Sequence, residues 1–325
     1  MRAPAKVNLA LAVLGRRPDG YHELRSVVGR LALADDLSIA VAGGAAGGRD
    51  SLRRRPEDAS PAADDLVLRA AATLRAWADR PLRPLGFTLR KRIPVAAGLG
   101  GGSSDAAAAL RLAAAAWGMA IDEPRLARLG AALGSDVPFF LADCALALVE
   151  GRGDRVRCLG GRGAAAGAPA RSPGLLLACS PGKSSTAAVF AGLAAARAVP
   201  DAPGAASPIT DRLVARLEGG DPHRALLGLA PELRDANDLW PAAARLMPHL
   251  PRLRGALERA LGLPVLLSGA GPTLFVLYPS PTAAEEARRV LRGRVAEGTV
   301  GALPHGPVRL IATSLEHAIA PGRTA

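Results

Sequence analysis

The sequence predicts an α+β protein that folds as two domains. Strand-type and helix-type segments follow one another along the 325 residues without the strict alternation of a doubly wound sheet. This length favours more than one domain and can bury a sizeable core without disulfides or metals. A low-complexity Gly/Ala/Arg stretch over residues 160–173 is the candidate linker or mobile loop, so we expect domains at residues 1–160 and 161–325.

Periodicity and turn chemistry predict the elements of the N-terminal half. Residues 7–14 alternate like a strand, and the Pro-Asp-Gly of residues 18–20 suits a turn. Apolar residues recur at helical spacing after position 65, and Ala and Leu favour helix after position 105. We expect strands at 7–14, 31–41 and 86–92, helices at 65–79, 106–117 and 124–133, and a loop at 43–63.

The C-terminal half shows the same mixture of short apolar strands and amphipathic helices. Residues 175–179 read as a buried strand, and residues 268–273 form a Gly-rich turn between two more. We expect strands at 144–150, 175–179, 265–267, 274–278 and 308–313, helices at 184–196, 210–217, 252–261 and 283–292, and a loop at 200–208.

The formal net charge of +12 suggests an acidic partner such as nucleic acid. Aromatic residues make up only 3% of the chain, however, which leaves little surface for stacking on bases. Lysine occurs only at Lys6, Lys91 and Lys183, so the excess is almost entirely arginine and is typical of a coding bias. We therefore expect a solvated basic surface and no nucleic-acid partner.

Hydropathy and cysteine content indicate in which cellular compartment we expect the protein. No segment approaches about 20 uninterrupted apolar residues, so we expect no membrane span, and no secretory signal is recognisable. Cys144, Cys158 and Cys179 lack metal-ligand spacing and cannot all pair, which predicts reduced thiols in a cytoplasmic protein.

Residues 94–106 carry the strongest chemical signal, with four glycines between positions 98 and 102 leading into a helix-forming run. Glycines let the backbone approach an anion, and the helix N-terminus offers free N–H groups, which together favour phosphate binding. A flexible loop with an ordinary N-cap is the alternative. The segment is neither a dinucleotide fingerprint nor a P-loop, and Gly182-Lys183-Ser184 also fails the P-loop pattern because Leu177 stands at the first glycine position.

Three further residues and one further segment are candidates for function. Lys6 and Asn8 lie two residues apart, on one face of the expected strand, and Arg cannot replace Lys where a compact ammonium is needed. Asp136 follows a helix terminator and can act as a general base, or else as a turn residue before Pro138. The Gly-rich segment 268–273 is a second loop of interest, or simply a tight hairpin turn.

The order of these segments resembles the GHMP kinases, over about residues 3 to 278. The signatures at 15–24, 100–106, 134–138 and 237–239 resemble more narrowly the branch that acts on 4-diphosphocytidyl-2-C-methyl-D-erythritol. The resemblance implies a two-domain α+β fold with a left-handed βαβ unit in the N-terminal domain and a ferredoxin-like C-terminal domain. It also implies ATP on the Gly-rich loop, Mg²⁺ with ligands that the sequence does not identify, and the substrate between the domains.

The resemblance further implies roles for individual residues. Asp136 would accept the proton of the 2-hydroxyl, Lys6 would stabilise charge beside it, and Asn8 would orient substrate hydroxyls. Tyr21 would stack on cytosine, His22 would bond its edge, and Phe190 would cover its other face. The residues expected to hold the ATP phosphates are Pro94, Ala96, Ala97, Gly98, Leu99, Gly100, Gly101, Gly102, Ser103 and Ser104.

Some residues depart from the family pattern, and other functions remain open. Asp65 stands where Asn is usual near the nucleotide base, and Ala270 stands where Ser is frequent. The alternatives are a GHMP kinase for homoserine or mevalonate, a basic nucleic-acid-binding module, and an inactive scaffold. Salt-dependent nucleic-acid retention would identify the second of these. We expect a monomer or a weak homodimer.

Overall fold

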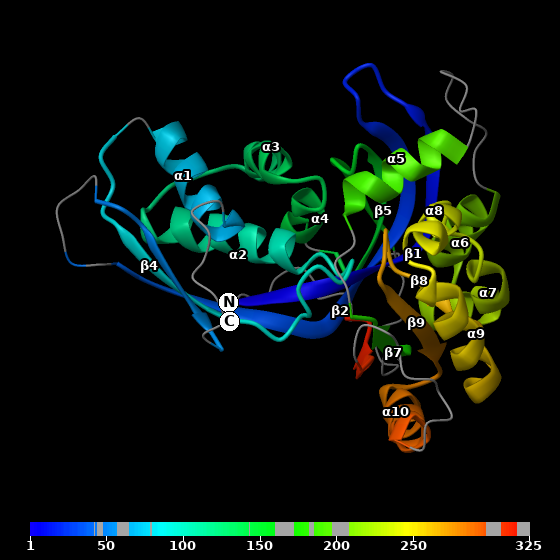
Figure 1. Cartoon of the computed structure of the whole chain (residues 1–325). Helices are drawn as coiled ribbons and strands as arrows, with labels where there is room; N and C mark the ends of the chain where they lie inside the picture. Colours follow the sequence, from blue (N-terminus) through cyan, green and yellow to red (C-terminus); the bar gives the residue numbers. More distant parts are fainter. Residues whose placement is uncertain are drawn as a thin grey trace.

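The computed structural model describes residues 1–41, 43, 48–56, 65–78, 80–142, 144–159, 172–181, 185–196, 208–296 and 307–316. These residues form two parts, each built on its own β-sheet (Figure 1). One sheet draws on residues 2–159 and the other on residues 174–314. The domain boundary at residue 160 lies outside the described residues and stays a prediction.

The first sheet has six strands and is antiparallel apart from one pair. β3 and β4 run parallel, with α1 between them in the chain, so they form a βαβ unit, whose left-handedness stays a prediction. The strands are β1 (Arg2–Arg16), β2 (His22–Val41), β3 (Ser51–Arg55), β4 (Leu85–Arg90), β5 (Leu146–Gly151) and β6 (Arg155–Leu159).

Four helices cover one face of this sheet (Figure 1). They are α1 (Leu66–Ala78), α2 (Gly101–Ala116), α3 (Glu123–Leu133) and α4 (Val137–Leu141). The inward face of α2 consists mainly of alanines, which are fully or almost fully buried. Small side chains let this helix lie close to its neighbours, which places its N-terminus near β1.

The second sheet has four antiparallel strands in the order β10-β7-β9-β8. Numbered along the chain this order is 4-1-3-2, with helices after the first and third strands, which is the ferredoxin-like arrangement that the resemblance implies. The strands are β7 (Gly174–Cys179), β8 (Leu266–Leu267), β9 (Thr273–Tyr278) and β10 (Arg309–Ser314). The helices are α5 (Thr186–Ala196), α6 (Pro208–Gly219), α7 (Pro222–Leu233), α8 (Trp240–Leu246), α9 (His249–Leu261) and α10 (Pro281–Ala296).

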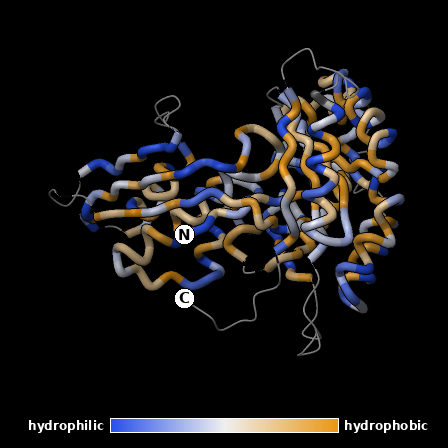
Figure 2. The backbone as a smooth tube through the Cα atoms, turned by 90° about the horizontal axis from the view of Figure 1, so that it is seen from below, coloured by the Kyte–Doolittle hydropathy of each residue, from blue (hydrophilic) through white to orange (hydrophobic). Residues whose placement is uncertain are grey.

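The two parts share a hydrophobic core. One buried cluster contains Val7 and Leu31 from the first sheet together with Leu175 and Phe275 from the second. Isolated β-bridges join Leu11 to Asn237 and Leu31 to Leu315. Figure 2 shows hydrophobic segments running through both parts. Packing of this kind positions residues of the two parts around one site.

Several expected elements differ in the structure. Residues 51–55 form β3 rather than loop, because this Arg-rich edge strand is held by main-chain pairing with β4 and carries no hydrophobic alternation of its own. α2 begins at Gly101, five residues earlier than expected. α4, β6, α7 and α8 were not foreseen. The expected loop at 200–208 lies almost wholly outside the described residues, as does the segment 182–184.

The expectation of three reduced thiols is wrong for two of them. Cys144 and Cys158 form a disulfide with a Cα–Cα distance of 5.5 Å. The antiparallel pairing of β5 and β6 brings them together, which spacing in the sequence does not reveal. Cys179 is free and buried.

Candidate active site

A cavity of about 1340 Å³ opens between the two parts of the molecule. It is lined by residues from β1, β2, the 94–103 segment, the start of α4 and the start of α5. The sequence-predicted residues that line it are Lys6, Asn8, Tyr21, His22, Pro94, Ala96, Ala97, Gly98, Leu99, Gly100, Gly101, Gly102, Ser103, Asp136 and Phe190. The fold therefore brings together fifteen of the sixteen candidates.

The 94–103 segment has the backbone of a tight loop that ends in a helix. Ala96, Gly98 and Gly100 have φ values of 55°, 74° and 69°, in the left-handed region that favours glycine. A Cβ on Gly98 would lie 2.7 Å from the Gly271 carbonyl oxygen, so this position has room for glycine alone. The N-terminus of α2 follows directly and supplies N–H groups and partial positive charge to the cavity.

Lys6 is held by a chain of side-chain hydrogen bonds on one face of β1. Its Nζ donates to Asn8 Oδ1 at 2.7 Å, and Asn8 Nδ2 donates to Ser26 Oγ at 2.9 Å. Ser26 Oγ in turn donates to the Ala10 carbonyl at 2.7 Å. Lys6 is only 5% exposed. Asn8 therefore positions the ammonium, and its contact with substrate hydroxyls stays a prediction.

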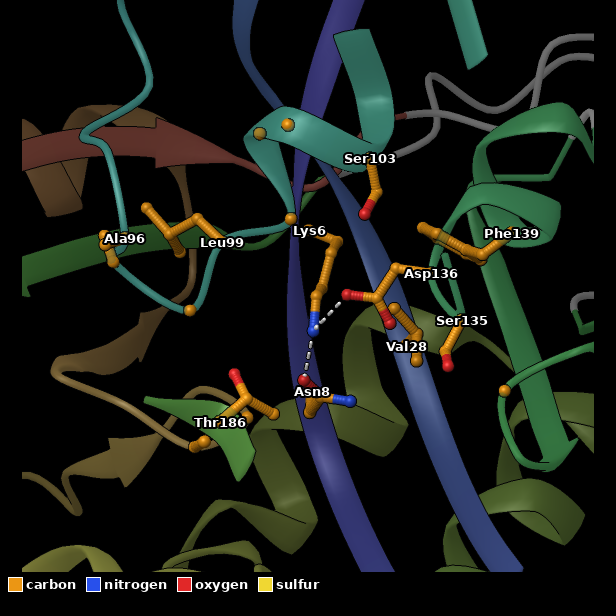
Figure 3. Close-up of a pocket in the computed structure, with 18 of the residues that line it drawn as sticks. Lys6, Asn8, Val28, Ala96, Leu99, Ser103, Ser135, Asp136, Phe139 and Thr186 are labelled. Carbon is orange, nitrogen blue, oxygen red and sulfur yellow. Dashed lines mark hydrogen bonds and ion pairs between the residues drawn. The ribbon is translucent and has the colours of Figure 1, made fainter. Parts of the chain in front are cut away.

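Asp136 faces Lys6 across the cavity floor (Figure 3). Its Oδ2 lies 3.4 Å from Lys6 Nζ, and the side chain is 45% exposed. Asp136 occupies the N-cap position of α4, yet its side chain makes no capping hydrogen bond. Asp136 does lie in the turn before Pro138, as the alternative expected, but its carboxylate is directed at the cavity.

The two serines at the start of α2 point in different directions. Ser103 lines the cavity, and its hydroxyl points towards the space beside Asp136 (Figure 3). Ser104 is 1% exposed and does not line this cavity, and its backbone N–H already donates to the Gly100 carbonyl at 2.9 Å. A helix directs successive side chains about 100° apart, so Ser104 does not share the direction of Ser103, and its expected phosphate contact stays a prediction.

Aromatic residues gather at the far end of the cavity. The rings of His22 and Phe190 stack with centroids 5.0 Å apart, and the Arg152 guanidinium lies 5.4 Å from the Tyr21 ring centroid. Tyr21 is 51% exposed, so its ring is available to a ligand. Burial lowers the pKa of His22, and the positive charge of Arg16 lowers it further, so the imidazole is neutral at pH 7.

Comparison with known proteins identifies the family to which the chain belongs. Residues 65–143 match the GHMP kinases N terminal domain, and residues 224–297 match the GHMP kinases C terminal domain. The chain is 40% identical over 310 residues to a 4-diphosphocytidyl-2-C-methyl-D-erythritol kinase of Xanthobacter autotrophicus, covering 89% of this chain and 93% of the relative. The chain belongs to the 4-diphosphocytidyl-2-C-methyl-D-erythritol kinase family.

Further comparisons agree with the assignment to the 4-diphosphocytidyl-2-C-methyl-D-erythritol kinase family. A relative of that name from Nocardia farcinica is 39% identical, with 90% of this chain and 89% of the relative covered. A crystal structure of 4-(cytidine 5'-diphospho)-2C-methyl-D-erythritol kinase matches with a TM-score of 0.67 and 30% identity, covering 97% and 98% of the two chains. A mevalonate kinase structure reaches a TM-score of 0.63 at 13% identity, covering 97% and 98%, which shows a shared fold only.

Membership in this kinase family confirms the expected kinase activity with ATP. The two alternative interpretations, a homoserine kinase and a mevalonate kinase, are therefore wrong. None of the helices in the described ranges is long and apolar enough to cross a membrane.

Two ion-pair groups beside the loop were missed by sequence reasoning. Asp65 pairs with Arg54 of β3, and its Oδ1 accepts a hydrogen bond from the Val67 N–H at 2.8 Å. Both side chains line the cavity of this kinase. Arg54 gave no signal, because its strand was expected to be loop.

The second group centres on the partly buried Lys91, which contacts Asp35 at 2.5 Å and Asp105 at 2.8 Å. Asp35 Oδ1 also accepts hydrogen bonds from the N–H groups of Arg92 and Ile93, just before the phosphate loop. Burial raises the pKa of Asp105 to about 7; Lys91 opposes this rise and the Asp35 carboxylate adds to it. Lys91 is one of only three lysines, which is the one signal that could have singled it out.

Proposed function

We propose that this protein transfers the γ-phosphoryl group of ATP to the 2-hydroxyl group of 4-diphosphocytidyl-2-C-methyl-D-erythritol, in the synthesis of isoprenoid precursors. The Lys6–Asp136 pair, at 3.4 Å beside the phosphate loop, carries the proposal. Phosphoryl transfer requires positioning and charge stabilisation more than covalent chemistry from the protein, and this pair offers both.

In this mechanism, Asp136 accepts the proton of the attacking hydroxyl. Lys6 keeps its ammonium next to the carboxylate and to the oxygen that develops charge, since Asn8 and Ser26 fix its direction. The N–H groups at the start of α2 hold the phosphates, and the left-handed glycines allow the close approach. These steps use residues that already face one another.

Mg²⁺ is part of the proposal. Ser103 and Asp136 present a hydroxyl and a carboxylate to the same space, and Mg²⁺ is usually bound by one or two protein oxygens together with phosphates and water. Within the described ranges no group of three acidic, His or Cys side chains is placed to hold a metal ion. Ser103 and Asp136 would hold the ion, which when bound would neutralise negative charge on the ATP phosphates.

The aromatic end of the cavity suits the cytidine of the substrate. Tyr21 has an accessible ring for stacking, and the neutral His22 can donate one hydrogen bond and accept another at a base edge. Phe190 stacks on His22, so we propose that it fixes the imidazole rather than sandwiching the base with Tyr21.

The deciding experiment is magnesium-dependent release of ADP, measured with and without 4-diphosphocytidyl-2-C-methyl-D-erythritol. We expect strong stimulation by this substrate and none by homoserine or mevalonate. ATP binding without stimulation by the cytidylyl substrate would contradict the proposed substrate.

A further inference from the structure

The side-chain amide of Asn237 forms three hydrogen bonds to backbone groups. Its Nδ2 donates to the carbonyls of Leu267 at 3.0 Å and Gly269 at 2.9 Å, and its Oδ1 accepts from the Leu239 N–H at 3.0 Å. The side chain is buried and is not among the residues lining the cavity. Asn237 therefore acts on other parts of the protein rather than on a ligand.

The turn that Asn237 holds lies against the catalytic pair and the phosphate loop. A Cβ on Gly269 would lie 3.1 Å from Asn8 Oδ1 and 3.6 Å from Lys6 Nζ. Next to it, the fully buried Ser268 donates from Oγ to the Gly98 carbonyl at 3.0 Å. A shift of this turn would thus move both the loop and the wall behind Lys6.

The residues on either side of Asn237 hold β1. The Leu11 N–H donates to the Ala236 carbonyl at 2.8 Å, and the Asp238 N–H donates to the Leu11 carbonyl at 2.9 Å. Asp238 Oδ2 also accepts from the Val13 N–H at 3.0 Å. Since β1 also carries Lys6 and Asn8, residues 236–238 link the catalytic strand to the 268–271 turn.

We propose that Asn237 is a positioning residue that sets the spacing between the phosphate loop and the Lys6–Asn8 pair. It does so by fixing the 268–271 turn, through which Ser268 reaches Gly98. The role needs two donors and one acceptor on a short side chain, which Asn supplies and Asp does not. The inference rests on the proposed function only for its turnover measurement.

A double-mutant cycle tests the route through Ser268. We expect Asn237→Ala to lower kcat/KM for ATP by about 10- to 100-fold, because a misplacement of about 1 Å can cost about 100-fold. Ser268→Ala should lower it by a similar or smaller factor. The double variant should be little worse than Asn237→Ala, because residues acting through one contact are not additive.

Two further variants separate positioning from stability. Trp117→Phe removes a hydrogen bond from Nε1 to the Arg83 carbonyl at the opposite end of α2, so it should lower the unfolding midpoint and leave kcat and KM unchanged. Asn237→Asp keeps the acceptor but turns an oxygen towards two carbonyl oxygens. We expect it to be at least as impaired as Asn237→Ala.

Calorimetric binding of a non-hydrolysable ATP analogue provides a second readout that does not depend on the phosphoryl acceptor. Weaker binding in the Asn237 variants, but not in Trp117→Phe, supports the proposal even if the wild-type protein is not stimulated by the cytidylyl substrate. The proposal is overturned if Asn237→Ala loses stability while keeping wild-type kinetics and analogue affinity. It is also overturned if the effects of the two single substitutions multiply in the double variant.

Discussion

At the scale of single residues, the surroundings of Lys6 explain why lysine stands there in an arginine-rich chain. A Cβ on Gly100 would lie 2.9 Å from Lys6 Cγ, so the lysine stem fills the space beside the loop. The compact ammonium then reaches both Asn8 and Asp136. A planar guanidinium is larger and needs a different geometry, so Lys6→Arg is not a conservative change here.

Asp136→Asn should lower kcat by about 10² to 10⁴, because the amide cannot accept the hydroxyl proton. We expect little change in KM for ATP, to be checked by steady-state ADP release. Asp211→Asn is the matched control. It also removes a carboxylate from an ion pair, the one in which Asp211 Oδ1 lies 2.8 Å from the Arg25 guanidinium, but this pair does not involve Lys6. Near-wild-type turnover in Asp136→Asn would show that the carboxylate is not the base.

Tyr21→Ala should raise KM for the cytidylyl substrate much more than KM for ATP, because it removes a stacking surface worth about 1–3 kcal/mol per base. Tyr21→Phe keeps the ring and should stay close to wild type. Steady-state kinetics with each substrate varied in turn gives the comparison. Equal effects on both KM values would argue against stacking on the base.

The raised pKa of the Asp105 carboxyl group predicts that the free energy of unfolding depends on pH. Its pKa rises from an ordinary 3.8 to about 7 in the folded state, so the folded state binds more protons than the unfolded state between these values. Its stabilising contribution is fully present below about pH 4 and is lost as the pH rises through 7.

Urea unfolding at pH 5, 6, 7 and 8 checks this sign. The free energy of unfolding of Asp105→Asn should rise relative to wild type across this range, by an amount on the order of 1 kcal/mol per pH unit below pH 7. Lys91 and Asp35 remain in the variant, so the comparison isolates Asp105. A difference that is constant with pH would contradict the assignment.

At the scale of elements, the phosphate loop depends on the C-terminal turn as well as on its own glycines. Gly98 lies against the carbonyl oxygens of Ser268 and Gly271, in another part of the chain. The loop conformation is thus set by a close backbone approach between two elements, and glycine is required on both conformational and steric grounds.

Gly98→Ala should reduce both stability and affinity for ATP. Its φ of 74° strains an L-residue, and its Cβ would lie 2.7 and 2.8 Å from two backbone oxygens. Gly118→Ala is the control, because it has a φ of 63° and nothing within 4 Å of the added Cβ. We expect the control to lose about 1 kcal/mol and to keep its affinity. Equal behaviour of the two variants in thermal unfolding and ATP titration would contradict the steric argument.

At the scale of the whole molecule, buried apolar contacts join the two parts. Leu31, Leu175 and Phe275 belong to one cluster and are almost completely buried. The cavity lies where these parts meet, so the relative position of Lys6 and the C-terminal turn depends on this shared core.

Leu31→Ala should lower the free energy of unfolding by about 2–5 kcal/mol, because it opens a cavity in the shared core. We expect one cooperative transition in urea, with coincident far-UV circular dichroism and tryptophan fluorescence, since Trp117 and Trp240 report on different parts. Val290→Ala, at an exposed site, should change stability little. Two separated transitions would indicate parts that unfold independently.

Local patterns in the sequence determined the features that depend on neighbouring residues. Alternation placed Lys6 and Asn8 on one face of a strand, and the glycines of the 98–102 run predicted a phosphate loop before a helix. The motif order led to the correct family, because its spacings are specific when taken together. Helix and strand periods are properties of short segments, so they can be read without the fold.

The tertiary structure alone decided the features that depend on contacts between distant segments. It brought Asp136 to Lys6, joined Cys144 to Cys158, formed β3 with Arg54 beside Asp65, and turned Ser104 away from the cavity. It also made Asn237 the link between β1 and the C-terminal turn. These contacts arise from the packing of two sheets around a shared core, and no local periodicity records which residues that packing will bring together.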